Sequence, residues 1–110
     1  MTGAFKKGSD LPLSELGGGV RRRILSHDEK IMAVEVHFDK GAVGAMHSHA
    51  HSQISYVLSG RFLATVGTEE KEIATGDTYV TKRDEPHGVI CLEAGALLDV
   101  FAPRRDDFLK

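Results

Sequence analysis

The sequence GAVGAMHSHAHSQISYVLSG, residues 41–60, carries His47, His49, His51 and Gln53 at every second position. Three of the six histidines in the 110-residue chain lie in this stretch. Neutral imidazole is the commonest metal ligand among protein side chains, so several imidazoles in one short stretch indicate a metal site. The residues that follow, 54–58, have strand character, so the stretch joins a candidate metal site to a predicted strand.

Strand geometry separates these four side chains. In an extended chain His47 and His49 point to the same side with their Cα atoms roughly 6.5 Å apart, so both imidazoles can reach one ion at about 2.1 Å. Gln53 would lie about 13 Å beyond His49 on a straight strand. The chain must therefore bend between His49 and Gln53 if both bind the same ion. His51 sits in that bend, and we expect it to line the cavity or support a ligand, not to bind the ion.

From residue 20 onward almost every segment has strand character. Residues 31–38 alternate between an apolar and a polar face. Ser59-Gly60 has the length and chemistry of a tight hairpin turn. Turn signals recur about every 8 to 12 residues, and no stretch keeps a helical period for three turns. The chain is therefore predicted to be all-β and folded as a jelly-roll barrel, with further strands at 54–58, 61–66, 71–74, 78–81, 87–92 and 96–102.

The length of the chain predicts one domain. We expect an N-terminal arm at residues 1–19 that packs on the barrel or on a second subunit, a barrel at 20–103, and a C-terminal tail at 104–110. A single core of this size is small, so pairing with a second copy would help to bury apolar surface. A homodimer is therefore expected.

The charge pattern argues against nucleic acid as a partner. The formal net charge is −2 with both signs interspersed, and Arg21, Arg22 and Arg23 alternate faces of a strand without making a basic patch. The N-terminus lacks the apolar core of a signal peptide, and no apolar run reaches the roughly 18 residues of a membrane span. The single cysteine, Cys91, has no internal partner. These features predict a cytoplasmic protein that does not bind membranes.

Two motifs resemble those of the cupin family. Gly41, five residues, His47, one residue, His49, three residues, Gln53, six residues and Gly60 resemble the first cupin motif, with glutamine in place of glutamate. Gly76-Asp77, with His87 eleven residues after Gly76, resembles the second motif, whose histidine is the remaining metal ligand. Lys82 stands where that motif usually has proline, a departure that touches no ligand. The resemblance implies a cupin β-barrel that binds a metal through His47, His49, Gln53 and His87.

The glutamine changes the electrostatics of the implied site. Three neutral imidazoles and a neutral amide leave the full charge of a divalent ion available to whatever binds, so the site is expected to attract an anionic ligand and to act as a strong Lewis acid. It also departs from the two-histidine, one-carboxylate pattern of non-haem iron oxygenases. We expect one divalent transition metal ion, with nickel or zinc favoured and iron, manganese or copper also suited to the ligands.

Longer segments resemble the KdgF-type cupins of pectin and alginate breakdown: GGGVRRRIL, HSHAHSQISYVLSG, the Pro86-His87-Gly88 turn and EAGALLDVFAPRRDDFL. The resemblance implies conversion of 4,5-unsaturated monouronates, released by polysaccharide lyases, to linear 5-keto-4-deoxyuronates. In that family an Asp-x-Phe-x-x-x-Arg constellation faces the metal. The matching positions are Asp99, Phe101 and Arg105.

The chemistry of these residue types suits that reaction. Asp99 and Phe101 share one face of the predicted strand 96–102, so a carboxylate and an aromatic ring would enter the same cavity. Arg105 offers a planar fork that can hold the carboxylate of a small anionic sugar. Arg104 is adjacent, and either arginine can face the substrate while the other pairs with Asp106 or Asp107. The hypothesis is that Asp99 moves protons, the metal stabilises enolate charge and Phe101 forms an apolar wall.

Two other functions remain open. Many small cupins are metal-dependent dioxygenases, although Gln53 among the ligands disfavours that reading. The chain can also be a sugar- or anion-binding module without turnover, for which loss of Asp99 and Arg105 would be the expected sign. Both residues are present.

Overall fold

The computed structural model describes residues 3–110, which form eight antiparallel strands and two short 3-10 turns. All eight strands are hydrogen bonded in one sheet. The elements in chain order are η1 (Gly8–Asp10), β1 (Ser14–Gly17), β2 (Val20–His27), β3 (Met32–Phe38), β4 (Val43–His47), β5 (Ser52–Val66), β6 (Glu69–Ala74), β7 (Thr78–Thr81), β8 (His87–Ala102) and η2 (Asp106–Leu109).

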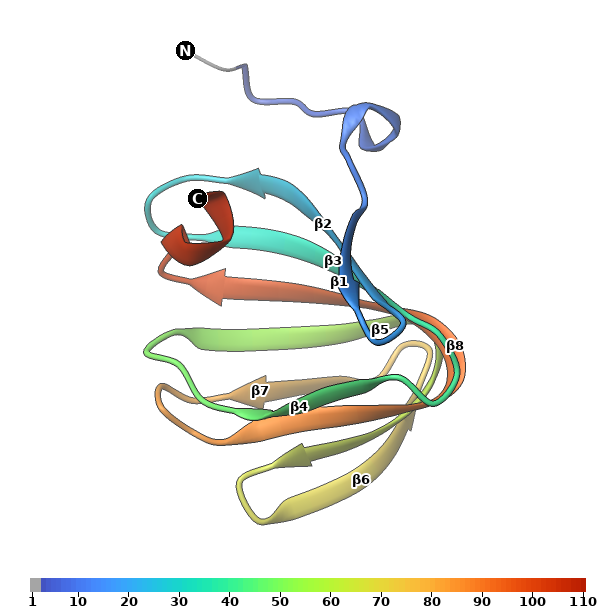
Figure 1. The fold of residues 1–110 in the computed structure, drawn as a ribbon. Helices are drawn as coiled ribbons and strands as arrows, with labels where there is room; N and C mark the ends of the chain where they lie inside the picture. The colour runs from blue at the N-terminus through green and yellow to red at the C-terminus, as the bar shows by residue number, and fades with distance from the viewer. Residues whose placement is uncertain (1–2) are drawn as a thin grey trace.

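Two long strands, β5 and β8, form the spine of the molecule. They pair along their whole length, from Ser52 opposite Ala102 to Val66 opposite His87. Both strands bend, so the sheet folds over into two layers (Figure 1). One layer carries β2 and β3 beside the second half of β8, and the other carries β4 beside its first half. The predicted all-β jelly-roll architecture is confirmed.

The hairpin predicted at Ser59-Gly60 is wrong, because β5 runs through these residues without turning back. The pairing of β5 with β8 shifts register around them. Before the shift the buried side chains stand at odd positions, as at Val57, and after it at even positions, as at Phe62. One extra residue in the strand produces this change of parity and a local bend, which is the property of a β-bulge.

Glycine is required where the two bends touch. Gly60 has φ 82°, and a Cβ there would lie 2.5 Å from the carbonyl oxygen of Glu93. A Cβ on Gly95 would overlap the carbonyl group of Ser59. The backbones of β5 and β8 therefore approach too closely at this point for any side chain.

Gly95→Ala is expected to lower the free energy of unfolding by at least about 3 kcal/mol, because the methyl group overlaps backbone that belongs to two long strands. Urea denaturation followed by circular dichroism measures the loss. Gly8→Ala is the control, since nothing lies within 4 Å of a Cβ there, and it should stay within about 0.5 kcal/mol of the wild type. A Gly95→Ala protein as stable as this control would contradict the close approach.

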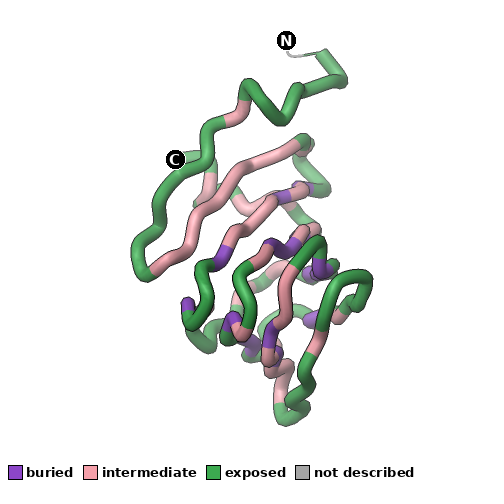
Figure 2. Tube along the Cα trace, turned by 90° about the vertical axis from the view of Figure 1, so that its right-hand side faces the viewer, coloured by how far each residue is buried: buried purple, intermediate pink, exposed green. Residues whose placement is uncertain are grey.

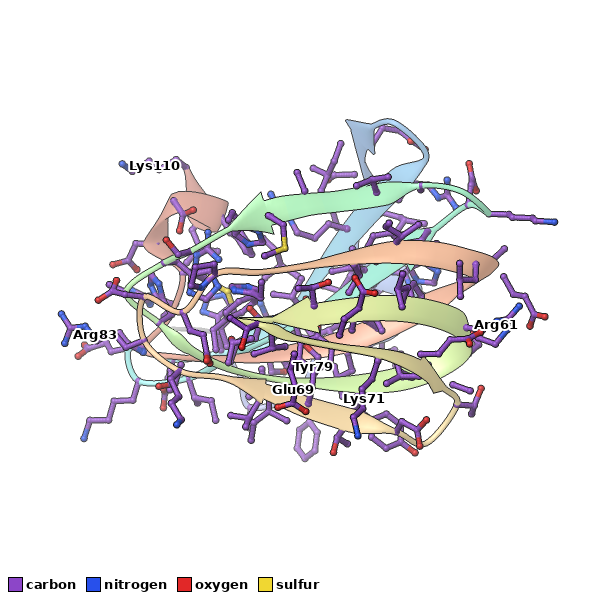
Figure 3. The ribbon with its side chains drawn as sticks, turned by 90° about the horizontal axis from the view of Figure 1, so that it is seen from below. Arg61, Glu69, Lys71, Tyr79, Arg83 and Lys110 are labelled. Carbon is purple, nitrogen blue, oxygen red and sulfur yellow. The ribbon has the colours of Figure 1, made fainter. Side chains whose placement is uncertain are left out.

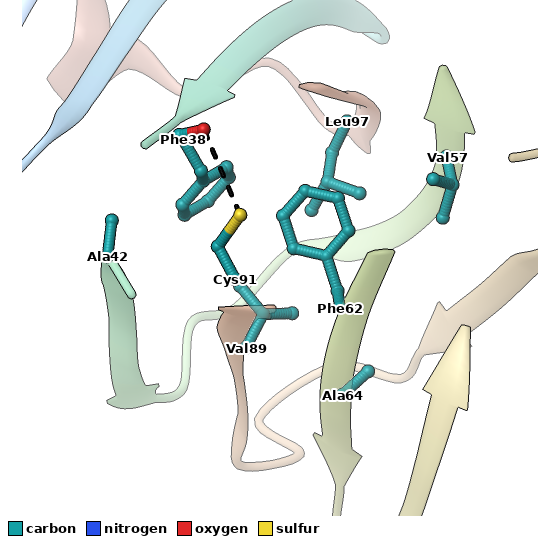
Figure 4. Close-up of a cluster of buried hydrophobic side chains, with 8 residues drawn as sticks. All are labelled: Phe38, Ala42, Val57, Phe62, Ala64, Val89, Cys91 and Leu97. Atoms are coloured by element: carbon teal, nitrogen blue, oxygen red, sulfur yellow. Dashed lines mark hydrogen bonds between the residues drawn. The ribbon is translucent and has the colours of Figure 1, made fainter. Parts of the chain in front are cut away.

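The main hydrophobic core lies between the two layers (Figure 4). The rings of Phe38 and Phe62 meet edge to face at 5.3 Å between centroids, a favourable geometry for aromatic pairs. Cys91 is a buried free thiol in this cluster. Phe38 and Leu97 also line the cavity described below, so the core forms part of its wall. A second, smaller cluster of buried side chains consists of Met32, Val34 and Phe101. Phe101 lines the same cavity.

The predicted arm, residues 1–19, is only partly a strand. Its first two residues lie outside the described residues, and the part before β1 is exposed except at the half-buried Leu11 (Figure 2). Residues 14–17 form β1, which pairs with β2. Packing of the arm on a second subunit stays a prediction. In residues 3–110 no helix is long and apolar enough to span a membrane.

Candidate metal centre

Three histidines from separate segments converge at one end of the folded sheet. His47 is the last residue of β4 and His87 the first of β8, and the two are direct partners across the strand pair. His49 lies in the short loop between β4 and β5. The ring centroids are 4.4 Å apart for His47 and His87 and 4.8 Å for His49 and His87. One ligand nitrogen from each histidine lies within 4.8 Å of the other two.

Backbone carbonyl groups select the tautomer of all three imidazoles. In each ring Nδ1 lies within hydrogen-bond distance of a carbonyl oxygen, which can only accept. Nδ1 must therefore carry the proton, and Nε2 of the neutral ring keeps its lone pair. The acceptors are Ala45 O at 2.8 Å from His47, His51 O at 3.0 Å from His49 and Glu85 O at 2.9 Å from His87.

The surroundings of the Nε2 atoms fit a bound cation. Nε2 of His87 is buried without a hydrogen-bond partner among residues 3–110. Nε2 of His49 faces Oε1 of Gln53 at 3.0 Å. Gln53 donates its Nε2 to the hydroxyl of Ser55 at 2.9 Å, and that hydroxyl donates to Asp99, so two acceptors face each other at His49. A divalent ion satisfies such lone pairs, and three imidazole nitrogens with an amide oxygen are a suitable donor set.

Burial tunes two of the imidazoles for this role. It lowers the pKa of His49 and of His87, although hydrogen bonds that the protonated rings donate to Gln53 and to the Glu85 carbonyl act in the opposite direction. Both rings therefore favour the neutral form that can bind a metal near neutral pH.

The bend expected between His49 and Gln53 is present as the loop that precedes β5. Gln53 is buried, near the start of that strand. His51 is not one of the three convergent histidines. Its ring centroid lies 5.5 Å from that of His49, and its carbonyl oxygen orients the His49 ring.

A cavity of about 350 Å³ opens beside the histidines. The predicted residues Asp99, Phe101 and Arg105 all line it, together with His47, His87 and Gln53. Asp99 is buried, and its Oδ1 accepts a hydrogen bond of 2.6 Å from Ser55. Burial raises the pKa of Asp99 to about 6, although the hydrogen bond from Ser55 lowers it. Such a carboxyl group can both hold and release a proton near neutral pH.

The C-terminal segment closes part of the cavity wall. Arg105 lines the cavity and forms a two-point ion pair with Asp107, at 3.0 Å and 2.8 Å. Arg104 instead pairs with Asp106 at 2.8 Å and does not line the cavity. The sequence did not decide which of Arg104 and Arg105 faces the cavity, and in the structure Arg105 lines it. Its guanidinium lies 5.1 Å from the ring centroid of Phe101.

Sequence reasoning missed three cavity or neighbouring residues: Ser55, Tyr79 and Arg22. Ser55 links Gln53 to Asp99. Burial and the nearby carboxylate of Asp99 raise the pKa of Tyr79, so its hydroxyl remains protonated. Tyr79 lies within the body of the molecule, whereas Arg61 and Lys110 point outward (Figure 3). The alternation of side chains along a strand could have indicated two of them, because Ser55 and Tyr79 stand on inward positions of β5 and β7.

Comparison with known proteins gives consistent matches. The family model described as the cupin domain matches residues 34–101. The pectin degradation protein KdgF of Dickeya dadantii strain 3937 is 44% identical over 102 residues, which cover 91% of this chain and 93% of that protein. An RmlC-like cupin from Shewanella frigidimarina superposes with a TM-score of 0.94 at 38% identity, covering 97% of this chain and 96% of the other. KdgF from Halomonas sp. superposes with a TM-score of 0.91 at 38% identity, covering 97% and 99%.

Proposed function

From the premise that this chain belongs to the cupin family, and within it to the KdgF-type proteins, we propose that it acts in pectin degradation. The reaction proposed is the conversion of 4,5-unsaturated monouronates, from pectin or alginate lyases, to linear 5-keto-4-deoxyuronates. The observation that carries this proposal is that two of three convergent histidines that could hold a metal ion, His47 and His87, line one cavity with Asp99, a buried carboxyl group with a raised pKa. Its wall also contains the cationic side chain of Arg105.

The proposed metal site consists of His47, His49 and His87 with Gln53 as the fourth ligand. A divalent ion held there supplies positive charge that favours the build-up of negative charge on a substrate oxygen. The three imidazoles are held ready by their bonds to backbone carbonyl groups. Because no carboxylate belongs to this set, the ligands do not reduce the attraction for an anionic sugar. Nickel or zinc suits these ligands.

The reaction requires proton movement but no net gain or loss of atoms. The bond between the anomeric carbon and the ring oxygen breaks, the anomeric hydroxyl loses its proton, and an aldehyde and an enol are formed. The enol then loses its hydroxyl proton while carbon 4 gains one, which gives the 5-ketone. We assign these proton transfers to Asp99, since a carboxyl group with a pKa of about 6 can exchange protons near neutral pH.

Ser55 and Gln53 hold Asp99 in position. The hydroxyl of Ser55 donates to Asp99 at 2.6 Å and accepts from Gln53 at 2.9 Å. This chain of hydrogen bonds connects Asp99, the proposed proton carrier, to Gln53, a proposed metal ligand. The orientation of each side chain therefore depends on the other. Phe101, buried beside His49, would provide the apolar surface against which the sugar ring is placed.

Metal-loaded protein is expected to accelerate the loss of the conjugated double bond of an unsaturated galacturonate or mannuronate monomer. Removal of the metal with a chelator should return the rate to that of the spontaneous reaction, and added nickel or zinc should restore it. The decay of ultraviolet absorbance measures the rate, with the metal salt alone as the control. Equal rates with metal-loaded and metal-free protein would contradict the proposed function. Oxygen uptake with a flavonol, diketone or thiol would instead support a dioxygenase.

We also propose that the protein acts as a homodimer. Ile54 in β5 and Val80 in β7 are direct partners, 54% and 57% exposed, and burial of such apolar neighbours would favour association. The mass measured by light scattering tests this. A cytoplasmic location stays a prediction, which cell fractionation would test.

A further inference from the structure

Arg22 occupies an inward position that an apolar side chain would normally fill. It lies in β2 between Val20, which packs on the main core, and Ile24, which packs on the second cluster. Val36 of β3 is its direct partner across the strand pair. Arg22 lines the cavity described above. A charged group on the inner face of a sheet is unfavourable unless a partner compensates it.

Among residues 3–110 no carboxylate lies within ion-pair distance of Arg22, whose nearest compensation is the ring of Phe108. The two neighbours of Arg22 in the strand are each paired, Arg21 with Asp39 at 3.1 Å and Arg23 with Glu35 at 2.9 Å. Arg22 has no ion pair with a carboxylate in this part of the chain. Its guanidinium group therefore keeps its charge and its donors available to a ligand in the cavity.

A second guanidinium group lies close to the first. Cζ of Arg22 is 3.9 Å from the ring centroid of Phe108, and Cζ of Arg105 is 4.2 Å from the same centroid. The ring belongs to η2, which folds back beside β2 and β3 (Figure 1). Burial and the charge of Arg105 lower the pKa of Arg22, and the charge of Asp107, which acts in the opposite direction, does not cancel them. Two like charges held on one ring repel each other, and an anion between or beside them would relieve the repulsion.

We propose that Arg22 binds the carboxylate of the sugar and forms, with Arg105, a two-arginine clamp in the cavity wall. The identity of the sugar rests on the proposed function, whereas the charge of the ligand is inferred from the clamp itself. Two donors of Arg105, Nε and Nη2, are already directed at Asp107. Arg22 makes no ion pair within residues 3–110, so its donors are not committed to a carboxylate of the protein. The cavity, about 350 Å³, matches one small ligand.

The direct test measures binding without turnover, with D-galacturonate as the probe and D-galactose as the neutral comparison. Isothermal titration of the metal-loaded protein should show that Arg22→Gln weakens galacturonate binding by about 10- to 100-fold, the range for loss of a hydrogen-bonded charge partner. Galactose binding should not change. Arg21→Gln is the matched control, because Arg21 is the adjacent arginine and pairs with Asp39 outside the cavity; it should bind galacturonate as the wild type does.

A purely structural role of Arg22 in packing against Phe108 makes a different prediction. Arg22→Lys keeps the charge and should retain part of the affinity, whereas Arg22→Met keeps the apolar stem and should bind as poorly as Arg22→Gln. If the Arg22→Met protein binds galacturonate better than the Arg22→Lys protein, the role of Arg22 is its contact with Phe108 and the clamp is wrong. The clamp is also wrong if a chelator abolishes binding while Arg22→Gln leaves it unchanged, since the ion alone would then hold the carboxylate.

Turnover separates this inference from the proposed function. With an unsaturated monouronate, Arg22→Gln should raise KM by more than it lowers kcat. Wild-type turnover with an unchanged KM in Arg22→Gln would overturn the clamp and leave the proposed function standing. Galacturonate binding that depends on Arg22, in a protein without turnover of any unsaturated uronate, would support the clamp and overturn the proposed function.

Discussion

Asp99→Asn is expected to lower kcat on a 4,5-unsaturated monouronate by at least about 100-fold while the protein keeps its metal. Asparagine has nearly the same shape and its amide oxygen can still accept the hydrogen bond from Ser55. It cannot carry a proton between the oxygen and carbon atoms of the sugar. Absorbance decay measures the rate, and metal analysis of the same sample verifies the content. A full rate with bound metal would remove Asp99 from the mechanism.

The same substitution should stabilise the metal-free protein at high pH. The pKa of Asp99 is about 6 in the folded protein, against 3.8 as its ordinary value, so the folded state binds more protons between these values. The stability contributed by Asp99 is therefore fully present below about pH 4 and is lost as the pH rises through about 6. At pH 8 the loss amounts to about 3 kcal/mol.

Thermal unfolding of chelated wild-type and Asp99→Asn proteins at two pH values measures this effect. The variant should unfold at a higher temperature at pH 8 and show little gain at pH 4. A gain of equal size at both values would mean that ionisation of Asp99 is not its cause. A buried carboxylate that weakens the fold while it serves the reaction is a known exchange of stability for function.

His87→Ala is expected to reduce metal affinity by at least about 100-fold and the rate to that of the spontaneous reaction. The proposed metal site loses one of its three imidazole ligands in this variant. The effect should be large because His87 is 3% exposed and its Nε2 has no other partner in residues 3–110. Competition with a chromogenic chelator measures affinity, and circular dichroism verifies that the variant is folded.

His37→Ala is the matched control for this prediction. His37 is also on a strand, but its Nε2 contacts Glu35 at 2.6 Å and it does not converge with the other three histidines. This variant should bind one ion per chain with wild-type affinity. If His87→Ala binds the ion as tightly as His37→Ala does, the ion is held elsewhere.

Much of the fold was predictable from local patterns. Alternation over residues 31–38 indicated β3, and Met32, Val34 and Phe38 are buried as expected. The spacing of His47, His49 and Gln53 required a bend that the loop before β5 supplies. Strand β1, in a polar glycine-rich segment, was missed, and β4 was anticipated only at its end, through the strand geometry assumed for His47 and His49. That geometry is wrong for His49, which lies in the loop after β4. Both strands belong to the sheet through pairing with a distant or neighbouring strand, which local propensity does not report.

The sequence alone was sufficient for the family, the all-β class and the positions of the candidate ligands, because these depend on spacing along one chain. The bulge at Ser59-Gly60 was not predictable, since the same two residues suit a hairpin and the outcome depends on the backbone of Gly95 across the sheet. Arg22 was equally ambiguous, because both faces of β2 carry arginine. Its inward orientation follows from packing of Val20 and Ile24 on the two cores. Contacts between residues far apart in the chain decide such questions, and alternation alone does not specify which face becomes the interior.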